Sequence, residues 1–407
     1  MCKWEWKKIS TLVTKCQNIK WDKVPLDDSR LYIDLSSVNK DTQCIEDVSE
    51  VNVENAPSRA KQIIHENDVL FATTRPTQKR VCIVERQYDN QICSTGFCVL
   101  RPLDCLESKY LFYCLLSDDF YSYIKPLEKG ANYPAVTDGD VKNYEIPVPP
   151  LSEQNRIVKF LDEEFSKIDT LKTNAETNLK NAKELFETTL EKELNPQSRH
   201  SGRSEESSAE LPSGWEWKKI GDFCETSSGG TPLKQHNEYY ENGNIPWLRS
   251  GEVCQKEIFE TEMCITQKGM ENSSAKYFPE NSVVVAMYGA TAGQVGIVRF
   301  RTTTNQAVCG IFPNEKYKTE YLYYALLSKK KELVAQAVGG AQPNISQIKI
   351  RNLQIPLPPL SVQKEIVARL DKLSENVKRL ETNYKQIIAN CDELKKSILK
   401  KTFEEES

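Results

Sequence analysis

Two long stretches carry the most regular pattern of apolar and polar positions in this chain. In residues 360–403 apolar side chains recur at alternating steps of four and three residues, and residues 151–195 carry a looser version of the same stripe. This spacing is typical of a coiled-coil seam, in which a helix buries one face against another helix. We therefore expect two long helices that pack on each other through Ile157, Leu161, Phe165, Ile168, Leu179, Ile366, Leu370, Leu373, Val377, Leu380, Ile387 and Leu394.

Each of these stretches follows a proline-rich segment. Prolines at 147, 149 and 150 hold the chain extended, because proline is excluded from helix interiors and central strands. Ser152 and Ser361 follow these segments and are predicted helix N-caps. The alternative is that each stripe packs only on its own globular domain. That is less consistent with a helix of roughly 65 Å, the length of residues 152–194 at the helical rise.

The two stretches belong to a wider internal repeat. The hexapeptide of residues 4–9 recurs unchanged at 215–220, and the Tyr-Leu-rich block of 110–117 recurs at 321–328 after the same interval. The order is thus globular unit, long helix, globular unit, long helix. We expect globular units at 1–150 and 213–359, helices at 151–195 and 360–403, and a polar, Ser-rich flexible linker at 196–212.

Within the globular units the pattern indicates a mixed α/β structure, so the whole chain is assigned to the α+β class. The predicted helices are 110–117 and 321–328. Short apolar runs bounded by turn residues predict strands. They lie at 31–35, 68–72, 80–85 and 96–101 in the first unit, and at 281–287, 294–299 and 306–312 in the second.

Composition restricts the class of protein. The chain has 407 residues, with 54 Lys and Arg against 58 Asp and Glu, which gives a net charge of −4. Bulk positive charge therefore does not account for nucleic-acid binding. Thirteen cysteines are present without a Cys-x-x-Cys pair, and only three histidines could share metal ligation. This pattern favours free thiols in a reducing cytoplasm over disulfides or a zinc site, and no apolar run is long enough to span a membrane.

Catalytic motifs are not found, but several polar loops are suggestive. The sequence contains no phosphate-binding loop, dinucleotide fingerprint, zinc-protease helix or nucleophile elbow, so we expect no catalytic residues, no cofactor and no metal. Residues 72–80 and 287–294 form one matched pair of loops, and residues 130–135 and 339–344 form another. Their Arg, Lys, Asn, Gln, Thr and Tyr side chains are those that contact bases and phosphates in nucleic-acid complexes. Residue type alone still favours ordinary solvated loops.

A family resemblance decides between these interpretations. IPVPPLSEQNRIV and IPLPPLSVQKEIV begin the long stretches, LPSGWEWKKIGD opens the second unit, and GGTPL, NIPWLRSGEV and MYGATAGQVGIV follow within it. YIDLSSV and VLFATTRPTQKR in the first unit are similar to another subtype of the same kind of domain. Together and duplicated, these segments resemble the specificity subunit of type I restriction-modification systems over essentially the whole chain. The first unit departs from the pattern because it has no LPSGW segment before WEWKK.

The resemblance implies two target recognition domains, each of which reads one half of a bipartite, asymmetric sequence in double-stranded DNA. It implies that the two long helices pair antiparallel and are related by a pseudo-twofold axis. It also implies docking of two methyltransferase subunits, which would hold S-adenosylmethionine, and of restriction subunits. The DNA-binding candidates are Thr74, Arg75, Lys79, Arg80, Asn132 and Tyr133 in the first unit, and Lys234, Arg249, Ser250, Tyr288, Gln294, Gln342 and Asn344 in the second.

Two other functions are weighed beside this one. The chain could be an enzyme with its own methyltransferase or nuclease activity, which methylation by the purified chain alone would indicate. It could also be a coiled-coil scaffold without a DNA role, which a lack of sequence preference in the presence of methyltransferase subunits would indicate.

Overall fold

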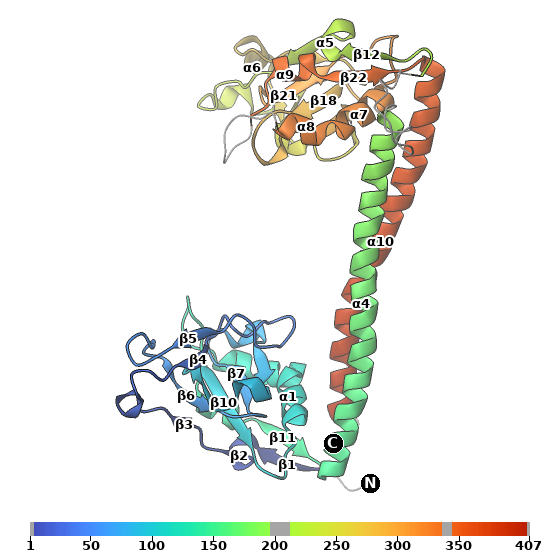
Figure 1. The fold of residues 1–407 in the computed structure, drawn as a ribbon. Helices are drawn as coiled ribbons and strands as arrows, with labels where there is room; N and C mark the ends of the chain where they lie inside the picture. The colour runs from blue at the N-terminus through green and yellow to red at the C-terminus, as the bar shows by residue number, and fades with distance from the viewer. Residues whose placement is uncertain (1–3, 196–211, 336–343, 405–407) are drawn as a thin grey trace. The chain divides into compact units, whose positions relative to one another are not determined.

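The structure is a computed structural model, and it describes residues 4–195, 212–335 and 344–404 (Figure 1). The chain divides into two compact units. The first comprises Met1–Glu176 with Tyr384–Ser407, and the second comprises Thr177–Asn383. Each unit therefore holds one globular part together with segments of both long helices. The expected linker at 196–212 lies almost entirely outside the described residues.

The first globular part contains two packed sheets and a short third one. Strands β2 (Val13–Thr14), β10 (Phe97–Pro102), β7 (Val69–Ala72) and β8 (Val81–Ile83) form one sheet in that order. The other has the order β3 (Gln17–Asn18), β6 (Ala60–Ile64), β9 (Gln91–Ser94), β4 (Arg30–Ile33) and β5 (Ser49–Val51). Strand β1 (Glu5–Lys8) pairs antiparallel with β11 (Glu145–Val148). The helices are α1 (Ser108–Leu116), α2 (Asp118–Ile124) and α3 (Asp138–Lys142).

The alternation of side chains along β7 explains why this strand is apolar throughout. Val69 and Phe71 point into a core that they share with α1, whereas Leu70 and Ala72 point into a second core toward the other sheet. Successive side chains of a strand face opposite sides, so a strand that is covered on both faces has no polar position. The layers are therefore helix, sheet and sheet.

The second globular part repeats this plan. Its first sheet has the order β13 (Thr226–Ser228), β21 (Val308–Ile311), β18 (Val283–Ala286), β19 (Val295–Val298) and β15 (Glu257–Ile258). Its second sheet has the order β16 (Cys264–Ile265), β14 (Ile245–Leu248), β20 (Thr302–Thr304) and β17 (Tyr277–Phe278). Strand β12 (Glu216–Lys219) pairs with β22 (Gln354–Leu357). The helices are α5 (Ile220–Phe223), α6 (Gln267–Glu271), α7 (Thr319–Ser328), α8 (Lys330–Ala335) and α9 (Gln347–Asn352).

The strands and helices that the sequence predicts in the globular parts are confirmed. All seven predicted strands are present, as β4, β7, β8, β10, β18, β19 and β21, and α1 and α7 cover the two Tyr-Leu-rich blocks. The predicted and observed strand ends differ by at most two residues. The α+β class is likewise confirmed.

The two long helices are α4 (Leu151–Leu194) and α10 (Leu360–Glu404), and they pack on each other antiparallel in both units. In the first unit Asp169 pairs with Lys395 at 2.5 Å and Lys172 pairs with Asp392 at 2.8 Å. Residue numbers rise along α4 as they fall along α10, so the two helices run in opposite directions. In the second unit Glu193 pairs with Arg369 at 2.6 Å.

Most of the predicted seam lies between the helices or against the globular cores. Ile157, Leu161, Ile168, Ile366, Leu370 and Val377 are buried, and Phe165, Leu179, Leu373 and Ile387 are half-buried. The ends of the helices also join the core of their own unit, since Ile157 and Leu161 pack with Leu399 and Phe403 beside α1. Both interpretations of the stripes are therefore partly right.

The prediction is wrong at Leu380 and Leu394, which are 37% and 48% exposed. A strict alternation of four and three residues follows one face of a helix only while the helix supercoils, because 3.6 residues make a turn. Glu381 and Lys395 are half-buried next to the exposed Leu380 and Leu394, so the covered face moves on by one residue at these two steps, whereas Cys391 is buried on the same repeat as Val377.

The predicted N-caps are also wrong, because α4 begins at Leu151 and α10 begins at Leu360, one residue before the serines. Fully buried glutamines organise both starts instead. The side chain of Gln154 accepts from the Glu107 N–H at 2.8 Å and donates to the Pro149 carbonyl at 2.8 Å. Gln363 does the same with the Lys318 N–H and the Pro358 carbonyl, both at 2.8 Å. Each glutamine thus ties the start of a long helix to the N-terminus of α1 or α7.

Two kinds of feature are not found in the part of the chain that the structure describes. No group of three or more His, Cys, Asp or Glu side chains there could hold a metal ion, and no helix there is long and apolar enough to cross a membrane. The twelve described cysteines are free thiols, and seven of them are buried.

Candidate functional site

In the first unit, the loop after β7 lies against the loop of residues 129–135. Thr74 and Ala135 form an antiparallel bridge, and the Arg75 N–H donates to the Pro134 carbonyl at 2.7 Å. The Arg75 guanidinium lies 5.0 Å from the centroid of the Tyr133 ring, which is 70% exposed. Four of the predicted residues, Thr74, Arg75, Asn132 and Tyr133, therefore lie on two adjoining loops.

The backbone of this loop is unusual at two positions. Arg75 and Lys79 flank a 3-10 turn (Pro76–Gln78) and have φ angles of 51° and 56°. Left-handed backbone in residues other than glycine is costly and is concentrated at functional sites. The left-handed backbone turns the chain sharply at each end of the turn.

Two further candidates in this loop are engaged with neighbouring groups. The Lys79 ammonium lies 4.4 Å above the Tyr121 ring and 3.2 Å from an Asp118 carboxylate oxygen. The Arg80 guanidinium donates to the Val38 carbonyl. Burial raises the pKa of Tyr121, so its ring remains a neutral surface under the lysine. A DNA contact by Lys79 or Arg80 requires release from these partners and stays a prediction.

The second unit repeats the pairing of the two loops with different side chains. Tyr288 and Asn344 form an antiparallel bridge, and the Ile345 N–H donates to the Met287 carbonyl at 2.8 Å. The left-handed positions of this loop are glycines, Gly289 at 71° and Gly293 at 81°. Gln294, half-buried, follows the second of them, whereas Gln342 lies outside the described residues. Within each unit, described residues of the two candidate loops thus lie together, Thr74 with Ala135 and Tyr288 with Asn344.

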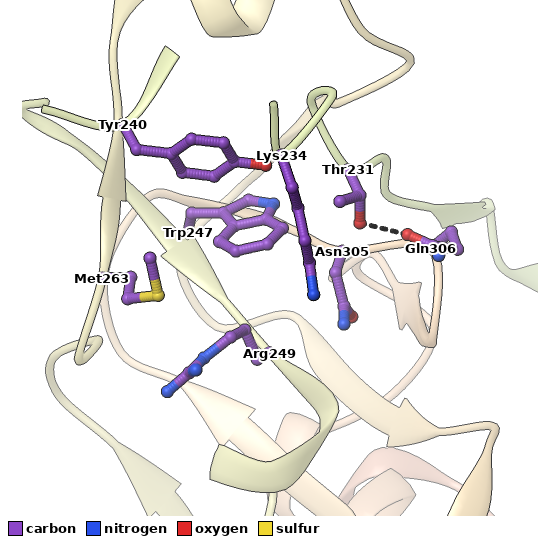
Figure 2. Close-up of a pocket in the computed structure, with 8 residues that line it drawn as sticks. All are labelled: Thr231, Lys234, Tyr240, Trp247, Arg249, Met263, Asn305 and Gln306. Atoms are coloured by element: carbon purple, nitrogen blue, oxygen red, sulfur yellow. Dashed lines mark hydrogen bonds between the residues drawn. The ribbon is translucent and has the colours of Figure 1, made fainter. Parts of the chain in front are cut away.

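A pocket of about 440 Å³ gathers other candidates of the second unit (Figure 2). Strands β14 and β20 are parallel neighbours, so Arg249 and Asn305, which follow them, are brought to the same edge. Ser250 comes directly after Arg249 but does not line the pocket. The lining residues are Thr231, Lys234, Tyr240, Trp247, Arg249, Met263, Asn305 and Gln306.

Hydrogen bonds fix the aromatic wall of this pocket. The Trp247 indole N–H donates to the Gly230 carbonyl at 3.0 Å, and the Tyr240 hydroxyl donates to the Pro232 carbonyl. Burial raises the pKa of Tyr240, which keeps this donor protonated. The two rings meet edge to face with centroids 5.8 Å apart. The rings therefore present apolar surface to the pocket.

The Gly-Gly pair of the GGTPL segment allows that segment to reach the pocket. A side chain at Gly229 would lie 1.9 Å from the Thr304 carbonyl oxygen, and one at Gly230 would lie 2.4 Å from the Ala275 nitrogen. These close approaches carry Thr231 and Lys234 to the pocket edge, where the Thr231 hydroxyl donates to Gln306.

The charge of Arg249 is balanced locally. Its guanidinium pairs with Glu252 at 3.2 Å and also with Glu262, while Lys234 is exposed.

Sequence reasoning missed Asn305 and Gln306, which follow β20 without a recognisable motif. It also missed the pocket role of Trp247, although this residue lies in the NIPWLRSGEV segment that contributes to the resemblance.

Comparison with known proteins agrees with this architecture. The model of the type I restriction modification DNA specificity domain matches residues 4–181 and again residues 212–389. The chain is 25% identical to the type I restriction enzyme HindI specificity subunit of Haemophilus influenzae, over 80% of this chain and 85% of that one. It is 27% identical to the MjaIX specificity subunit of Methanocaldococcus jannaschii, over 72% and 68%. The match to the Escherichia coli EcoR124I/EcoR124II specificity subunit, at 30% identity, spans only 40% of that relative.

Solved structures give the same result. A structure described as the basis of complex assembly and conformational transition of the type I R-M system has a TM-score of 0.86 and 27% identity, covering 100% of this chain and 99% of that one. The HsdS subunit from Thermoanaerobacter tengcongensis has a TM-score of 0.66 and 27% identity, covering 100% and 98%. On the duplicated domain match and these likenesses, the chain belongs to the family of type I restriction-modification DNA specificity subunits, which are non-catalytic recognition subunits.

Proposed function

We propose that each globular part reads one half of a bipartite, asymmetric DNA sequence through its paired loops. The observation that carries this proposal is the repeated loop pairing, Thr74 with Ala135 in the first unit and Tyr288 with Asn344 in the second. The same backbone frame presents Arg75 and Tyr133 in one unit and Tyr288 and Gln294 in the other. Different side chains on equivalent frames favour two unlike half-sites.

The balanced charge of the chain supports a role for partner subunits in binding the DNA backbone. With a net charge of −4, the chain has no excess of cations with which to neutralise phosphates. We propose that methyltransferase and restriction subunits bind this chain and supply phosphate contacts and chemistry, including S-adenosylmethionine binding by the methyltransferase subunits. In this scheme the pair formed by α4 and α10 holds the two readers at a fixed spacing and provides docking surface for these subunits.

The direct test is to map methylated bases in DNA from cells that express this chain with its methyltransferase subunits. The expected motif has two specified half-sites separated by a gap of unspecified bases. A continuous motif without a gap would contradict the proposal. Methylation by the purified chain alone would favour an enzyme, and methylation without sequence preference would favour a scaffold.

A further inference from the structure

One buried acceptor in the second unit has no partner among the described residues. Asn305 lines the pocket of Figure 2, but its side-chain oxygen is buried away from the pocket and accepts no hydrogen bond from a described residue. Nearly all buried polar atoms in proteins are paired, so an unpaired one needs an explanation. The backbone around it is fixed, because the Asn305 N–H donates to the Leu248 carbonyl at 3.0 Å and the Val308 N–H donates to the Asn305 carbonyl at 3.2 Å.

Most of the other polar groups of the pocket are already engaged. Trp247 and Tyr240 donate to backbone carbonyls, Thr231 donates to Gln306, and Arg249 is paired with two glutamates. What remains is an apolar slot with aromatic rings and the Met263 thioether, one unpaired acceptor, and the exposed ammonium of Lys234. This combination suits a flat aromatic ring that carries an N–H and is linked to an anion.

The pocket adjoins the proposed DNA-reading loops. Asn305 and Gln306 are followed by Ala307, whose carbonyl accepts from the Met287 N–H at 2.8 Å. Met287 precedes Tyr288, and its own carbonyl accepts from Ile345, next to Asn344. A pocket wall and both loops of the second unit are therefore joined by consecutive backbone hydrogen bonds.

We propose that this pocket binds one nucleobase of the bound DNA after that base has turned out of the duplex. The Asn305 amide then turns about its Cβ–Cγ bond, so that its oxygen faces the pocket and accepts from a base N–H. The ring lies along Trp247 and Met263, and Lys234 faces the adjoining phosphate. A base that stays stacked in the duplex cannot enter this pocket. The inference rests on the proposed DNA-reading function and adds a base-extrusion site to it.

The test uses the full chain assembled with its methyltransferase subunits and duplexes that contain the mapped target. Each base pair of the half-site assigned to residues 213–359 is altered in turn by an abasic residue on one strand. Where a base enters the pocket, removing its pairing partner abolishes the cost of unpairing, so binding should tighten on the order of tenfold or more at that position. Asn305→Ala should remove this gain.

Asn305→Ala should leave the thermal midpoint unchanged, because no protein hydrogen bond of this side chain is lost. Asn272→Ala is the matched control. Asn272 is exposed and only donates to the Lys268 carbonyl, at 2.9 Å, and its substitution should keep the abasic gain. If the target is distinguished from a scrambled duplex but no position shows a gain that depends on Asn305, the pocket inference alone is overturned. If the wild-type assembly does not distinguish the two duplexes, the proposed function fails with it.

Discussion

The substitution Arg75→Gly should separate DNA reading from folding. Arg75 has a left-handed backbone with φ of 51°, and glycine occupies the corresponding position of the second unit, as Gly289 with φ of 71°. Because the equivalent loop is built with glycine in one half of the same molecule, the backbone of the first loop should accept it. The guanidinium, by contrast, is lost completely.

The expected change in unfolding free energy is small because the contributions oppose each other. Removing a left-handed non-glycine residue gains about 1–2 kcal/mol. The greater freedom of glycine in the unfolded chain costs about 0.5–1 kcal/mol. Loss of the exposed stacking of Arg75 on Tyr133, at 5.0 Å, costs about 0.5–1 kcal/mol. The net change should thus lie within about 1 kcal/mol of zero.

The effect on DNA binding should be larger and should show what Arg75 contacts. If it contacts a base edge, affinity for the mapped target should fall by about 1–3 kcal/mol, roughly 5- to 150-fold, with relaxed specificity at one base pair. If it contacts a phosphate, the dependence of log affinity on log salt should fall by about 1 in slope, without a change in specificity.

The control is Asn67→Gly, which makes the same backbone change at φ of 69° away from the predicted DNA-binding residues. It should leave DNA affinity and salt dependence unchanged. Wild-type binding by Arg75→Gly would refute the assignment of this residue to the DNA surface. A loss of more than about 3 kcal/mol of stability would refute the reasoning about its backbone.

Four predictions concern the fold. Gln363→Ala leaves the Lys318 N–H and the Pro358 carbonyl without their hydrogen-bond partner. Amide hydrogen exchange at Lys318 should therefore quicken about 5- to 150-fold, equivalent to about 1–3 kcal/mol. The control Gln386→Ala loses only an exposed hydrogen bond to Asn390 and should not change this exchange rate. Leu161→Ala should destabilise the first unit by about 2–5 kcal/mol in urea unfolding, since Leu161 is fully buried. Leu394→Ala should lower the free energy of unfolding by about 0.5 kcal/mol or less, and a larger loss would show that Leu394 is buried between the helices. Iodoacetamide at about pH 8 should label the exposed Cys44, Cys105 and Cys254 but not Cys309, because burial raises the pKa of Cys309 to about 12 and the thiolate is the reactive form; equal labelling in a peptide mass map would contradict that burial.

The sequence was sufficient for the elements and for the repeat. Strands such as β7 and β18 are apolar on both faces and are bounded by turn residues, so burial alone marks them. The helix starts were misassigned because Ser152 and Ser361 satisfy a local capping rule, whereas Gln154 and Gln363 act through partners distant in sequence. A local pattern does not report such partners.

The candidate site was only partly predictable for the same reason. Loop pairs that match between the repeats could be aligned in the sequence, and the structure places described residues of these loops together in each unit, Thr74 with Ala135 and Tyr288 with Asn344. The pocket, however, is built from five separate segments, and the parallel pairing of β14 with β20 joins only two of them. No spacing along the chain connects Asn305 with Lys234 or Trp247.

The claim that two unlike readers act independently is tested most directly by exchanging one of them. Residues 1–150 are replaced by the first unit of a relative with a different target, and methylated DNA from cells with the same methyltransferase subunits is sequenced. The account predicts that one half of the motif changes while the other half and the gap length stay the same. A motif that changes in both halves, or in neither, would contradict it.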